Sequence, residues 1–403
     1  MASPVVNALR SPRFRRLFLA QTISRWGDTF NFVALVILVF QLTGSGLKVA
    51  GIVAFEILPV LAFGFIAGAV VDRLPRARVM IAADIARAAI ALALALSHES
   101  LWMVYLAAFG LSSFSVFFNP AAASVVPALV EEEDLIGANS AVWSGAVVSQ
   151  IVLAPLAGAL VATAGAGIAF GLNAVSFLIS AALLKGLRVE RAAHVAGKAI
   201  EDVREGWRVV RRSRFLRGLL VVQIFAALSA GATSALLVVL AQEHLDVGAT
   251  SLGFLLTAIG VGAALGPLVL QRFVTEVRRP LFLFGPYLLR GMVDLVLAAS
   301  KNFGVAMGAL ALYGVGTSTG NVTYNTALQK NVSDRLRGRV FATYDVVWQT
   351  FRLLSLALGG VLADAVGIRA VYVLGGILLI MAATLGALLV RGPAMQAQVD
   401  GPS

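Results

Sequence analysis

Long runs of apolar residues, separated by short polar segments, dominate the chain from one end to the other. Most runs reach the ~20 residues that a helix needs to cross a bilayer. Prolines inside several runs are tolerated where neighbouring helices satisfy the freed backbone groups. We predict twelve transmembrane helices, at residues 14–43, 47–71, 78–97, 101–127, 136–164, 167–187, 216–242, 249–273, 280–300, 303–330, 338–365 and 369–391.

The composition is that of a membrane protein. The chain is 59% hydrophobic and 13% charged, with a mean hydropathy of +0.89, whereas soluble domains carry about 25% charged residues. It has no cysteine, which excludes disulfides and thiolate metal sites. Its three histidines, His98, His194 and His244, show no spacing typical of metal ligands. We therefore predict no metal and no cofactor.

Basic residues gather in alternate connections between the predicted helices. They cluster before residue 17, after 47–71, across 185–217, and after 249–273 and 303–330, while the opposite connections hold only Lys48, Lys301 and Arg369. Cations mark cytoplasmic loops. We expect both termini in the cytoplasm of a multi-pass protein of the cytoplasmic membrane, without a cleaved signal peptide. The net charge of +11 then reflects orientation and predicts no nucleic-acid partner.

The two halves of the chain repeat each other weakly at an offset of 202 residues. Asn119 then meets Asn321, Gly158 meets Gly360, Leu160 meets Leu362 and Gly165 meets Gly367. Six helices per half, each half entering from the same side, predict parallel repeats. We therefore divide the chain into a first half at 1–187, a linker at 188–215 and a second half at 216–403.

The linker contains one amphipathic pattern. Ile200, Val203, Trp207 and Val210 recur at helical spacing, with charged residues between them. This pattern is typical of a helix on the inner leaflet. A partner-binding helix is the alternative.

A charged turn follows the second predicted helix. Gly68 and Asp72 are followed by Arg73, Arg76 and Arg78 in the segment Gly-Ala-Val-Val-Asp-Arg-Leu-Pro-Arg-Ala-Arg. The segment resembles the signature loop of the major facilitator superfamily, Gly-x-x-x-Asp-Arg-x-Gly-Arg-Arg/Lys, with proline at the second glycine position. The resemblance implies that Gly68, Asp72, Arg73 and Arg76 form a gating latch against the helix that carries Arg337 and Asp345.

Other segments resemble one efflux branch of this superfamily, which includes macrolide exporters and the enterobactin exporter. Residues 13–28 are similar to the first helix of that branch, and residues 119–127 and 337–339 fit it too. Pro155 and Gly158 resemble the antiporter motif Gly-Pro-x-x-Gly-Gly, with alanine at two glycine positions. The fourth helix lacks the arginine that drug/proton antiporters usually have there. The resemblance implies an all-α major facilitator fold, a monomer, and proton antiport.

Ionisable residues inside predicted spans are costly and therefore candidates for function. Asp28 lies three residues after Arg25, and we expect it to bind a proton or a cationic substrate, or else only to neutralise Arg25. Glu56 is a second proton-binding candidate, with a pair across helices, such as one with Arg25, as the alternative.

Two further acid–arginine pairs occupy equivalent helices of the two halves. We expect Asp84 with Arg87, and Arg290 with Asp294, to neutralise each other internally rather than contact substrate. Asp364 lies near the outer end of its helix, where we expect it to be solvated.

Uncharged polar residues complete the candidate site. Asn119 and Asn321 occupy equivalent positions of the two halves, and Tyr324 and Asn325 follow Asn321 on one helix. Such groups would orient a polar part of a ligand, or alternatively join helices by hydrogen bonds.

We conclude from the sequence that this is a membrane transporter and not an enzyme. It is expected to export amphiphilic or hydrophobic small molecules, as multidrug pumps do, by alternating access and in exchange for protons. Translocation of a lysolipid, lipid or siderophore is an alternative within the same fold, as is import of a sugar or metabolite. A receptor or scaffold that transports nothing is an alternative from another class.

Overall fold

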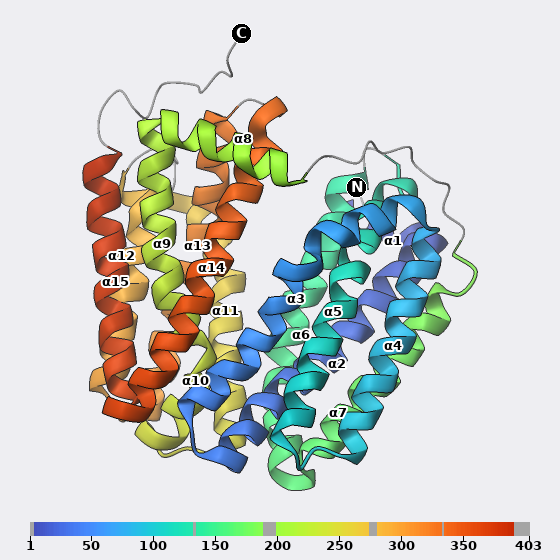
Figure 1. The fold of residues 1–403 in the computed structure, drawn as a ribbon, viewed down its shortest axis with the longest axis horizontal. Coiled ribbons are helices and arrows are strands. Elements are labelled where there is room, and N and C mark those ends of the chain that lie inside the picture. Colours follow the sequence, from blue (N-terminus) through green and yellow to red (C-terminus); the bar gives the residue numbers. More distant parts are fainter. Residues whose placement is uncertain (1–3, 132–133, 188–198, 274–279, 333, 391–403) are drawn as a thin grey trace. The chain divides into compact units, whose positions relative to one another are not determined.

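The computed structural model describes residues 4–131, 134–187, 199–273, 280–332 and 334–390, and these residues are almost entirely helical (Figure 1). The chain divides into two compact units. The first, here called the N-unit, comprises Met1–Gly44, Ile52–Ala196 and Gly248–Thr257. Its helices are α1 (Pro4–Arg10), α2 (Pro12–Thr43), most of α3 (Gly46–Arg73), α4 (Arg76–Leu96), α5 (Leu101–Val125), the 3-10 turn η1 (Val126–Ala128), α6 (Leu135–Ala164) and α7 (Ala166–Leu184).

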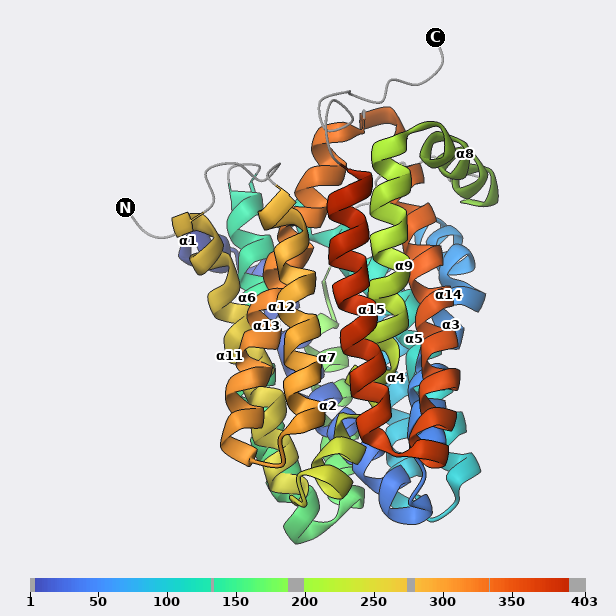
Figure 2. The same ribbon diagram turned by 90° about the vertical axis from the view of Figure 1, so that its left-hand side faces the viewer.

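The second unit, here called the C-unit, comprises Ser45–Gly51, Gly197–Val247 and Ala258–Ser403. In Figure 2, α9 lies beside α15, and α15 beside α12, which agrees with the contacts among these helices. The helices of this unit are α8 (Ala199–Arg212), α9 (Arg214–Ala235), α10 (Leu237–Val239), the π-turn η3 (Leu240–His244), most of α11 (Ala249–Phe273), α12 (Pro280–Ala299), α13 (Phe303–Asn331), α14 (Asp334–Val366) and α15 (Ile368–Leu389).

Two helices are divided between the units: the first turns of each belong to one unit and the rest of the helix to the other. The start of α3, within Ser45–Gly51, belongs to the C-unit, and the start of α11, within Gly248–Thr257, belongs to the N-unit. Each unit therefore packs a short helical end from the other part of the chain.

Capping residues in the sequence explain where several helices begin and end. Ser11 caps α2 by accepting a hydrogen bond from the Phe14 amide at 3.3 Å, and Pro12 follows at the first helical position. Gly44 ends α2 with a φ of +58°, a left-handed conformation that favours glycine. Asn302 caps α13 by accepting from the Val305 amide at 3.0 Å. These boundaries follow from local chemistry.

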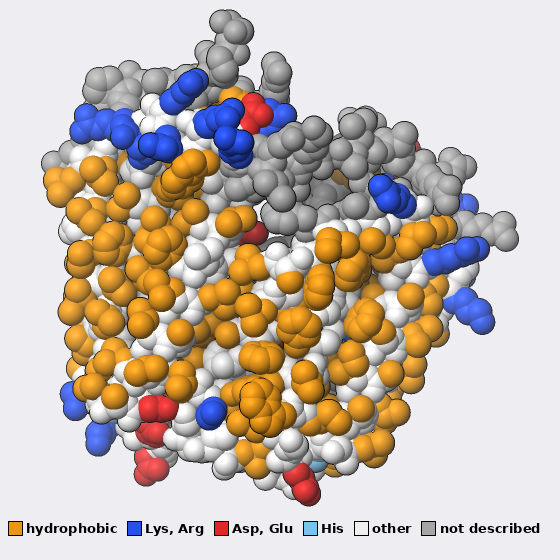
Figure 3. Space-filling view, viewed as in Figure 1, with side chains coloured by type: hydrophobic (Ala, Val, Ile, Leu, Met, Phe, Trp, Pro, Cys, Tyr) orange, Lys and Arg blue, Asp and Glu red, His pale blue; other side chains and the backbone are white. Residues whose placement is uncertain are grey.

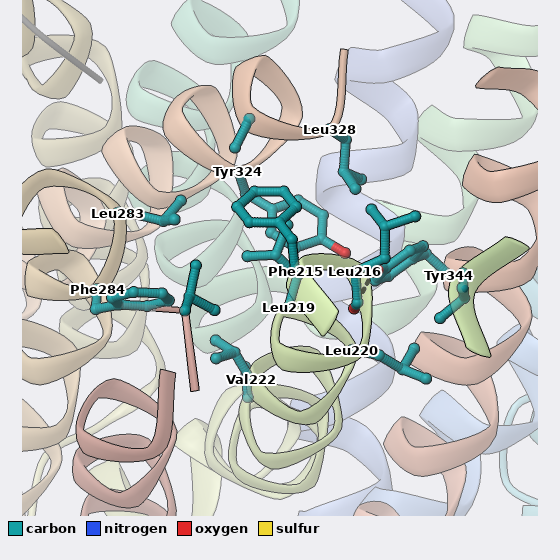
Figure 4. Packing of buried hydrophobic residues seen from close by; sticks show 14 of the residues in the cluster. Phe215, Leu216, Leu219, Leu220, Val222, Leu283, Phe284, Tyr324, Leu328 and Tyr344 are labelled. Atoms are coloured by element: carbon teal, nitrogen blue, oxygen red, sulfur yellow. Dashed lines mark hydrogen bonds between the residues drawn. The ribbon is translucent and has the colours of Figure 1, made fainter. Parts of the chain in front are cut away.

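The two units have separate apolar cores. In the N-unit, Phe14, Leu17 and Met80 lie among buried residues of α2, α4, α5, α6 and α7. In the C-unit, Leu216 and Leu328 pack with neighbours from α8, α9, α12, α13, α14 and α15 (Figure 4). These cores hold the helices that carry the site residues described below.

The outer flanks of the helices remain apolar. Large exposed hydrophobic side chains include Leu96, Trp102 and Leu281, at 80%, 68% and 71% exposure. In Figure 3, hydrophobic side chains cover the flanks of α9, α14 and α15, while Lys and Arg gather at the ends of these helices near α8. This is the surface that a bilayer requires.

Ten helices of the described chain are long and apolar enough to cross a membrane. Each of the other two predicted spans also falls in a long helix, α6 and α13. Within α6 the described apolar stretch is shorter, Ile151–Ala164, and α13 is enriched in Ser, Thr and Asn. The protein is an all-α integral membrane protein, and the count of twelve spans stays a prediction.

The predicted helix at 216–242 is not one regular helix. The regular helix α9 ends at Ala235, and the chain continues through α10 and a π-turn that ends at His244. The hydroxyls of Thr233 and Ser234 donate back to the carbonyls of Ser229 and Ala230, at 3.1 and 2.5 Å. Such bonds compete with regular helix geometry and bend helices.

The predicted linker is described only from residue 199, where α8 begins. In Figure 1, α8 lies across the ends of α9 and α14. Val209 and Val210 are buried in the C-unit core, and Glu205 pairs with Arg339 of α14 at 2.6 Å. The described apolar side chains of α8 thus pack on protein, except Trp207, which is 41% exposed. The side chains of Ile200 and Val203, and residues 188–198, lie outside the description.

Candidate functional site

The N-unit contains an open cavity of about 610 Å³, here called the N-cavity. A volume of this size is typical of small-molecule sites. Apolar and aromatic side chains supply part of its wall, and polar and charged groups the rest. It is lined by Gln21, Ser24, Arg25, Asp28, Thr29, Phe32, Val33, Arg87, Phe118, Asn119, Ala122, Ala123, Val126, Asn139, Val142, Ala154 and Leu256.

Three residues predicted for binding, Arg25, Asp28 and Asn119, line the N-cavity. Asp28 experiences the charges of both Arg87 and Arg25, but the structure shows no direct ion pair between Asp28 and Arg25 among the described residues. Both side chains remain exposed. Helix α2 is held beside α6 by the Trp26 indole, which donates to Ser149 Oγ at 2.8 Å. The arrangement places a carboxylate on the wall of a cavity.

Arg87 of α4 borders the N-cavity and has a direct ionic partner, although its buried Nε has no hydrogen-bond partner. It forms a salt bridge with Asp84 and donates to Ser115 Oγ at 3.3 Å. Its guanidinium lies 4.5 Å from the ring centroid of Phe118 and 4.3 Å from that of Phe177. The second oxygen of Asp84 accepts from Ser180 Oγ at 2.7 Å. The expected internal neutralisation is present here, although Arg87 also reaches the cavity.

Glu56, the second proton-binding candidate, is not among the residues that line the N-cavity. It lies half-buried on α3, and its backbone carbonyl accepts from Ser112 Oγ at 2.5 Å. Its role in proton binding stays a prediction.

The C-unit contains a second open cavity of about 310 Å³, here called the C-cavity. Asn321, Tyr324 and Asn325, which the sequence predicted for binding, all line it from α13. Its wall is formed by Gln223, Pro286, Tyr287, Arg290, Gly316, Thr317, Gly320, Asn321, Tyr324, Asn325, Phe341, Tyr344, Asp345 and Trp348.

The arginine and the acid of α12 are not joined as their counterparts on α4 are. Arg290 Nη2 donates to the Tyr313 hydroxyl at 2.9 Å, and its guanidinium lies 4.7 Å from the centroid of that ring. Asp294 instead accepts from Ser229 Oγ at 3.4 Å. Within the described chain the two form no direct ion pair, so the expected internal neutralisation is not seen. Residues four apart on one helix here face different neighbours.

Two tyrosines support the floor of the C-cavity. Tyr344 donates its hydroxyl to the Leu216 carbonyl at 2.6 Å, and its ring meets that of Tyr324 edge to face at 5.8 Å (Figure 4). The hydroxyl of Tyr324 is buried and has no hydrogen-bond partner. A buried hydroxyl without a partner is costly and indicates a place for a ligand or water.

The predicted gating loop is only partly described. The surroundings of Gly68 and the side chain of Asp72 lie outside the described part of the chain. Arg73 is exposed, and Arg76 donates to the Ser124 carbonyl at 3.1 Å. Arg76 thus ties the turn to the end of α5. The role of this loop as a latch stays a prediction.

The residues predicted to face that latch lie on α14. Arg337 is half-buried near the start of the helix. Asp345 is exposed and lines the C-cavity. Their part in gating also stays a prediction.

Pro155 and Gly158 lie where α6 crosses the first turns of α11 within the N-unit. A Cβ atom on Gly158 would lie 2.3 Å from the Ala249 carbonyl oxygen, and one on Gly253 would lie 2.5 Å from the Pro155 Cα. Thr257 Oγ1 donates to the Ile151 carbonyl at 2.9 Å. The motif therefore permits a close backbone crossing.

The equivalent crossing in the C-unit joins α14 to the first turn of α3. A Cβ atom on Gly360 would lie 2.7 Å from the Leu47 Cα. Asp364 accepts from the Gly46 amide and from Ser45 Oγ, both at 2.6 Å. Asp364 is exposed, as expected, but it also caps a helix N-terminus. Sequence reasoning missed this role.

Sequence reasoning also missed that Arg87 and Arg290 border cavities. Both belong to the acid–arginine pairs that the sequence predicted to neutralise each other rather than contact substrate. Their position inside apolar runs could have indicated this, because a charged residue in a membrane span is costly and is usually functional. Among the described residues, no group of three or more His, Cys, Asp or Glu is placed to hold a metal.

Known proteins are similar to this one over nearly its whole length. A family model described as "Transmembrane secretion effector" matches residues 3–402. The multidrug efflux pump Tap of Mycobacterium tuberculosis (strain ATCC 25618 / H37Rv) is 27% identical, covering 98% of both chains. Macrolide efflux protein A of Streptococcus pyogenes is 23% identical, covering 91% of this chain and 93% of that protein.

Solved structures share the fold at low identity. A bacterial homologue of the human lysosomal transporter Spinster, in an inward-facing and unoccupied conformation, matches with a TM-score of 0.73 at 16% identity over the full length of both chains. The nucleoside transporter NupG matches with a TM-score of 0.74 at 12% identity, covering 94% of this chain and 99% of that one. These similarities concern the fold.

Proposed function

Because the chain belongs to the transmembrane secretion effector family of major facilitator transporters, we propose that it exports amphiphilic small molecules from the cytoplasm by alternating access in exchange for protons. Its family and relatives are transporters rather than enzymes. In this proposal it lies in the cytoplasmic membrane with both termini inside, as the distribution of Lys and Arg indicates. Its two repeats would be the six-helix halves at 1–187 and 216–403.

The observation that carries the proposal is Asp28 on the wall of the N-cavity. Arg87 is neutralised by Asp84, so the cavity wall holds Arg25 and Asp28 as its remaining opposite charges. Ionised Asp28 leaves this wall neutral overall, while protonated Asp28 leaves it with one positive charge. Because Asp28 lines the cavity, such a change alters the affinity of this wall for a charged ligand. Proton and substrate would therefore compete at this wall.

Competition of this kind is sufficient for exchange. A ligand shifts a two-state equilibrium only by its different affinity for the two states. If the state open to the outside favours protonated Asp28 and the state open to the inside favours substrate, the proton gradient drives export. The gating loop with Gly68, Asp72, Arg73 and Arg76 would bias the same equilibrium from the inner side.

The test is transport by purified protein in proteoliposomes. Uptake of ethidium and of erythromycin would be measured with and without a pH gradient, for wild type, Asp28→Asn and Asp246→Asn. We expect the gradient to accelerate wild type and the control, whose exposed loop residue has a φ of +53° that Asn also adopts. Asp28→Asn should lose the response to the gradient. Transport that ignores the gradient in wild type would refute proton coupling, and absence of transport for amphiphiles would refute export.

A further inference from the structure

We propose that the C-cavity is a binding site for a carboxylate, with Arg290 as its cationic anchor and Tyr324 as a hydrogen-bond donor. This proposal rests on the proposed export function and deepens it. It names the substrate class as amphiphiles that carry a carboxylate on an apolar or aromatic body.

The first argument is the unsatisfied state of Arg290. Its side chain is only 7% exposed, and a buried charge without compensation is strongly unfavourable. The Tyr313 hydroxyl accepts one hydrogen bond from Arg290, and the buried Nε has no partner, as is also true of Arg87; unlike Arg87, Arg290 forms no direct ion pair within the described chain. A guanidinium offers five donors in a fork that matches a carboxylate. The site therefore presents more donors than the protein fills.

The second argument is the contrast with Arg87. That arginine occupies the equivalent helix of the other half and is paired directly with Asp84. Asp294 stands in the corresponding role beside Arg290, but its hydrogen bond goes to Ser229, and its other oxygen is buried without a partner. Asp294 is close enough for its charge to act on Arg290, but it does not contact the guanidinium, so donors of Arg290 remain open to a ligand.

The third argument is the polar chemistry gathered on α13. Tyr324 brings a buried hydroxyl without a partner. Asn321 and Asn325 line the same cavity, three residues before and one after it. On a helix Asn321 and Asn325, four apart, share one face. They add neutral donors next to the cation, which is the arrangement that an anionic group requires.

The fourth argument is the shape of the wall. A Cβ atom on Gly316 would lie 2.8 Å from the Arg290 Cγ, so the glycine leaves room for the arginine stem under α13. Tyr287, Phe341 and Trp348 supply aromatic surface around the polar groups. The volume of about 310 Å³ suits a small aromatic body with one charged group.

Asp345 also lines the C-cavity, and its negative charge opposes the attraction of Arg290 for an anion. Its side chain is exposed, whereas Arg290 is buried. Exposed charges are screened by solvent and interact weakly. The buried cation therefore dominates the recognition of a desolvated group, and Asp345→Asn should strengthen carboxylate binding by less than about threefold.

The test compares a carboxylate with its uncharged analogue. Binding of dansylglycine and of dansylglycinamide would be titrated by dansyl fluorescence on purified protein in nanodiscs of neutral lipid. We expect wild type to bind dansylglycine about tenfold more tightly than the amide, as a charge-assisted hydrogen bond allows. Arg290→Met should abolish this preference and Arg290→Lys should restore part of it. Arg369→Met, at an arginine of the same unit that does not line the C-cavity, should leave it unchanged.

Tyr324→Phe keeps the proposal testable if Arg290→Met does not fold, as judged by size-exclusion profile and thermal unfolding. It should reduce the preference about threefold. The proposal is overturned if wild type shows no preference for the carboxylate, if the preference survives in folded Arg290→Met, or if Arg369→Met removes it equally. Loss of the preference with intact transport would refute this site alone. A preserved preference without transport would refute the export function alone.

Discussion

The two units solve the same packing problem with different chemistry. In the N-unit, Gly158 of α6 lets the first turns of α11 approach, and the only side-chain bond described at that crossing is from the Thr257 hydroxyl. In the C-unit, Gly360 of α14 admits the first turn of α3, and the carboxylate of Asp364 caps that turn. The repeat thus preserves the small residue, and only one copy adds a charge.

The buried arginines of the two units also differ in their polar partners. In the N-unit, Arg87 has its own acid, so its charge is internal to the protein. In the C-unit, Arg290 has only a tyrosine as a direct hydrogen-bond partner within the described chain. The polar partners therefore differ between the two units, while a glycine lies at a close backbone crossing in both, because small residues let helices approach closely.

The largest effect on transport is expected from filling the two crossings. Gly158→Leu and Gly360→Leu should each abolish most transport, because the new Cβ would meet backbone atoms that cannot move aside. Overpacking of this kind costs about 1–3 kcal/mol or more. The measurement is transport together with the folded fraction in detergent.

Gly171→Leu and Gly308→Leu are matched controls for these changes. Both positions have open space where a Cβ would lie. They should transport normally. If either crossing variant behaves like its control, the crossing in that unit is not a close contact in the membrane.

Removal of the acid should destabilise the two arginine sites to different extents. Asp84→Asn should destabilise the protein by about 3–5 kcal/mol, since it leaves Arg87 without its buried ion pair. Asp294→Asn should cost less, about 1–2 kcal/mol, because only the bond from Ser229 is lost directly. Thermal unfolding in nanodiscs would measure both. Equal losses would contradict the difference between the sites.

A smaller effect is expected at the cap of α3. Asp364→Asn should cost about 1 kcal/mol, because a neutral amide accepts the Gly46 and Ser45 hydrogen bonds less strongly than a carboxylate. The repeat offers the reciprocal change, Ala162→Asp, at the equivalent position of the N-unit. If the two crossings are equivalent, it should stabilise the start of α11 by about 0.5 kcal/mol. Destabilisation by Ala162→Asp would show that the repeat does not extend to the caps.

The smallest effect concerns pH. Burial, and then the nearby charge of Asp364, raise the pKa of Glu243, which lies beyond the regular part of α9. The folded state therefore holds a proton that the unfolded chain releases, so this contribution to stability is complete below the ordinary pKa of glutamate and disappears as the pH rises through the raised value.

Glu243→Gln should remove this pH dependence of the unfolding temperature. Asp364→Asn should weaken it, because it removes the negative charge that helps to raise the pKa. If both variants keep the wild-type dependence of unfolding temperature on pH, another group is responsible for it.

Much of the architecture can be predicted from the order of residues along the chain. The apolar runs predict where the long helices lie, and local signals such as Ser11, Gly44 and Asn302 mark helix ends. A membrane-length helix is present in the predicted segment 216–242, but its regular part ends at Ala235, and the apolar pattern gives no sign of this change. Of the predicted binding residues, Arg25, Asp28 and Asn119 line one cavity, and Asn321, Tyr324 and Asn325 line the other. Glu56 lines neither.

Hydropathy, the spacing of small residues and the placement of cations are properties of the chain itself, because the bilayer acts on each segment independently. They were enough to identify a polytopic transporter and the charged residues inside its apolar helices, and they predict a repeat of two halves. The partners of those charges depend on which side chains from distant helices meet. Arg87 and Arg290 look alike in sequence, each with an acid a turn away. Only packing against α7 and α5 in one unit, and against α13 and α9 in the other, made the first an internal ion pair and left the second facing a cavity.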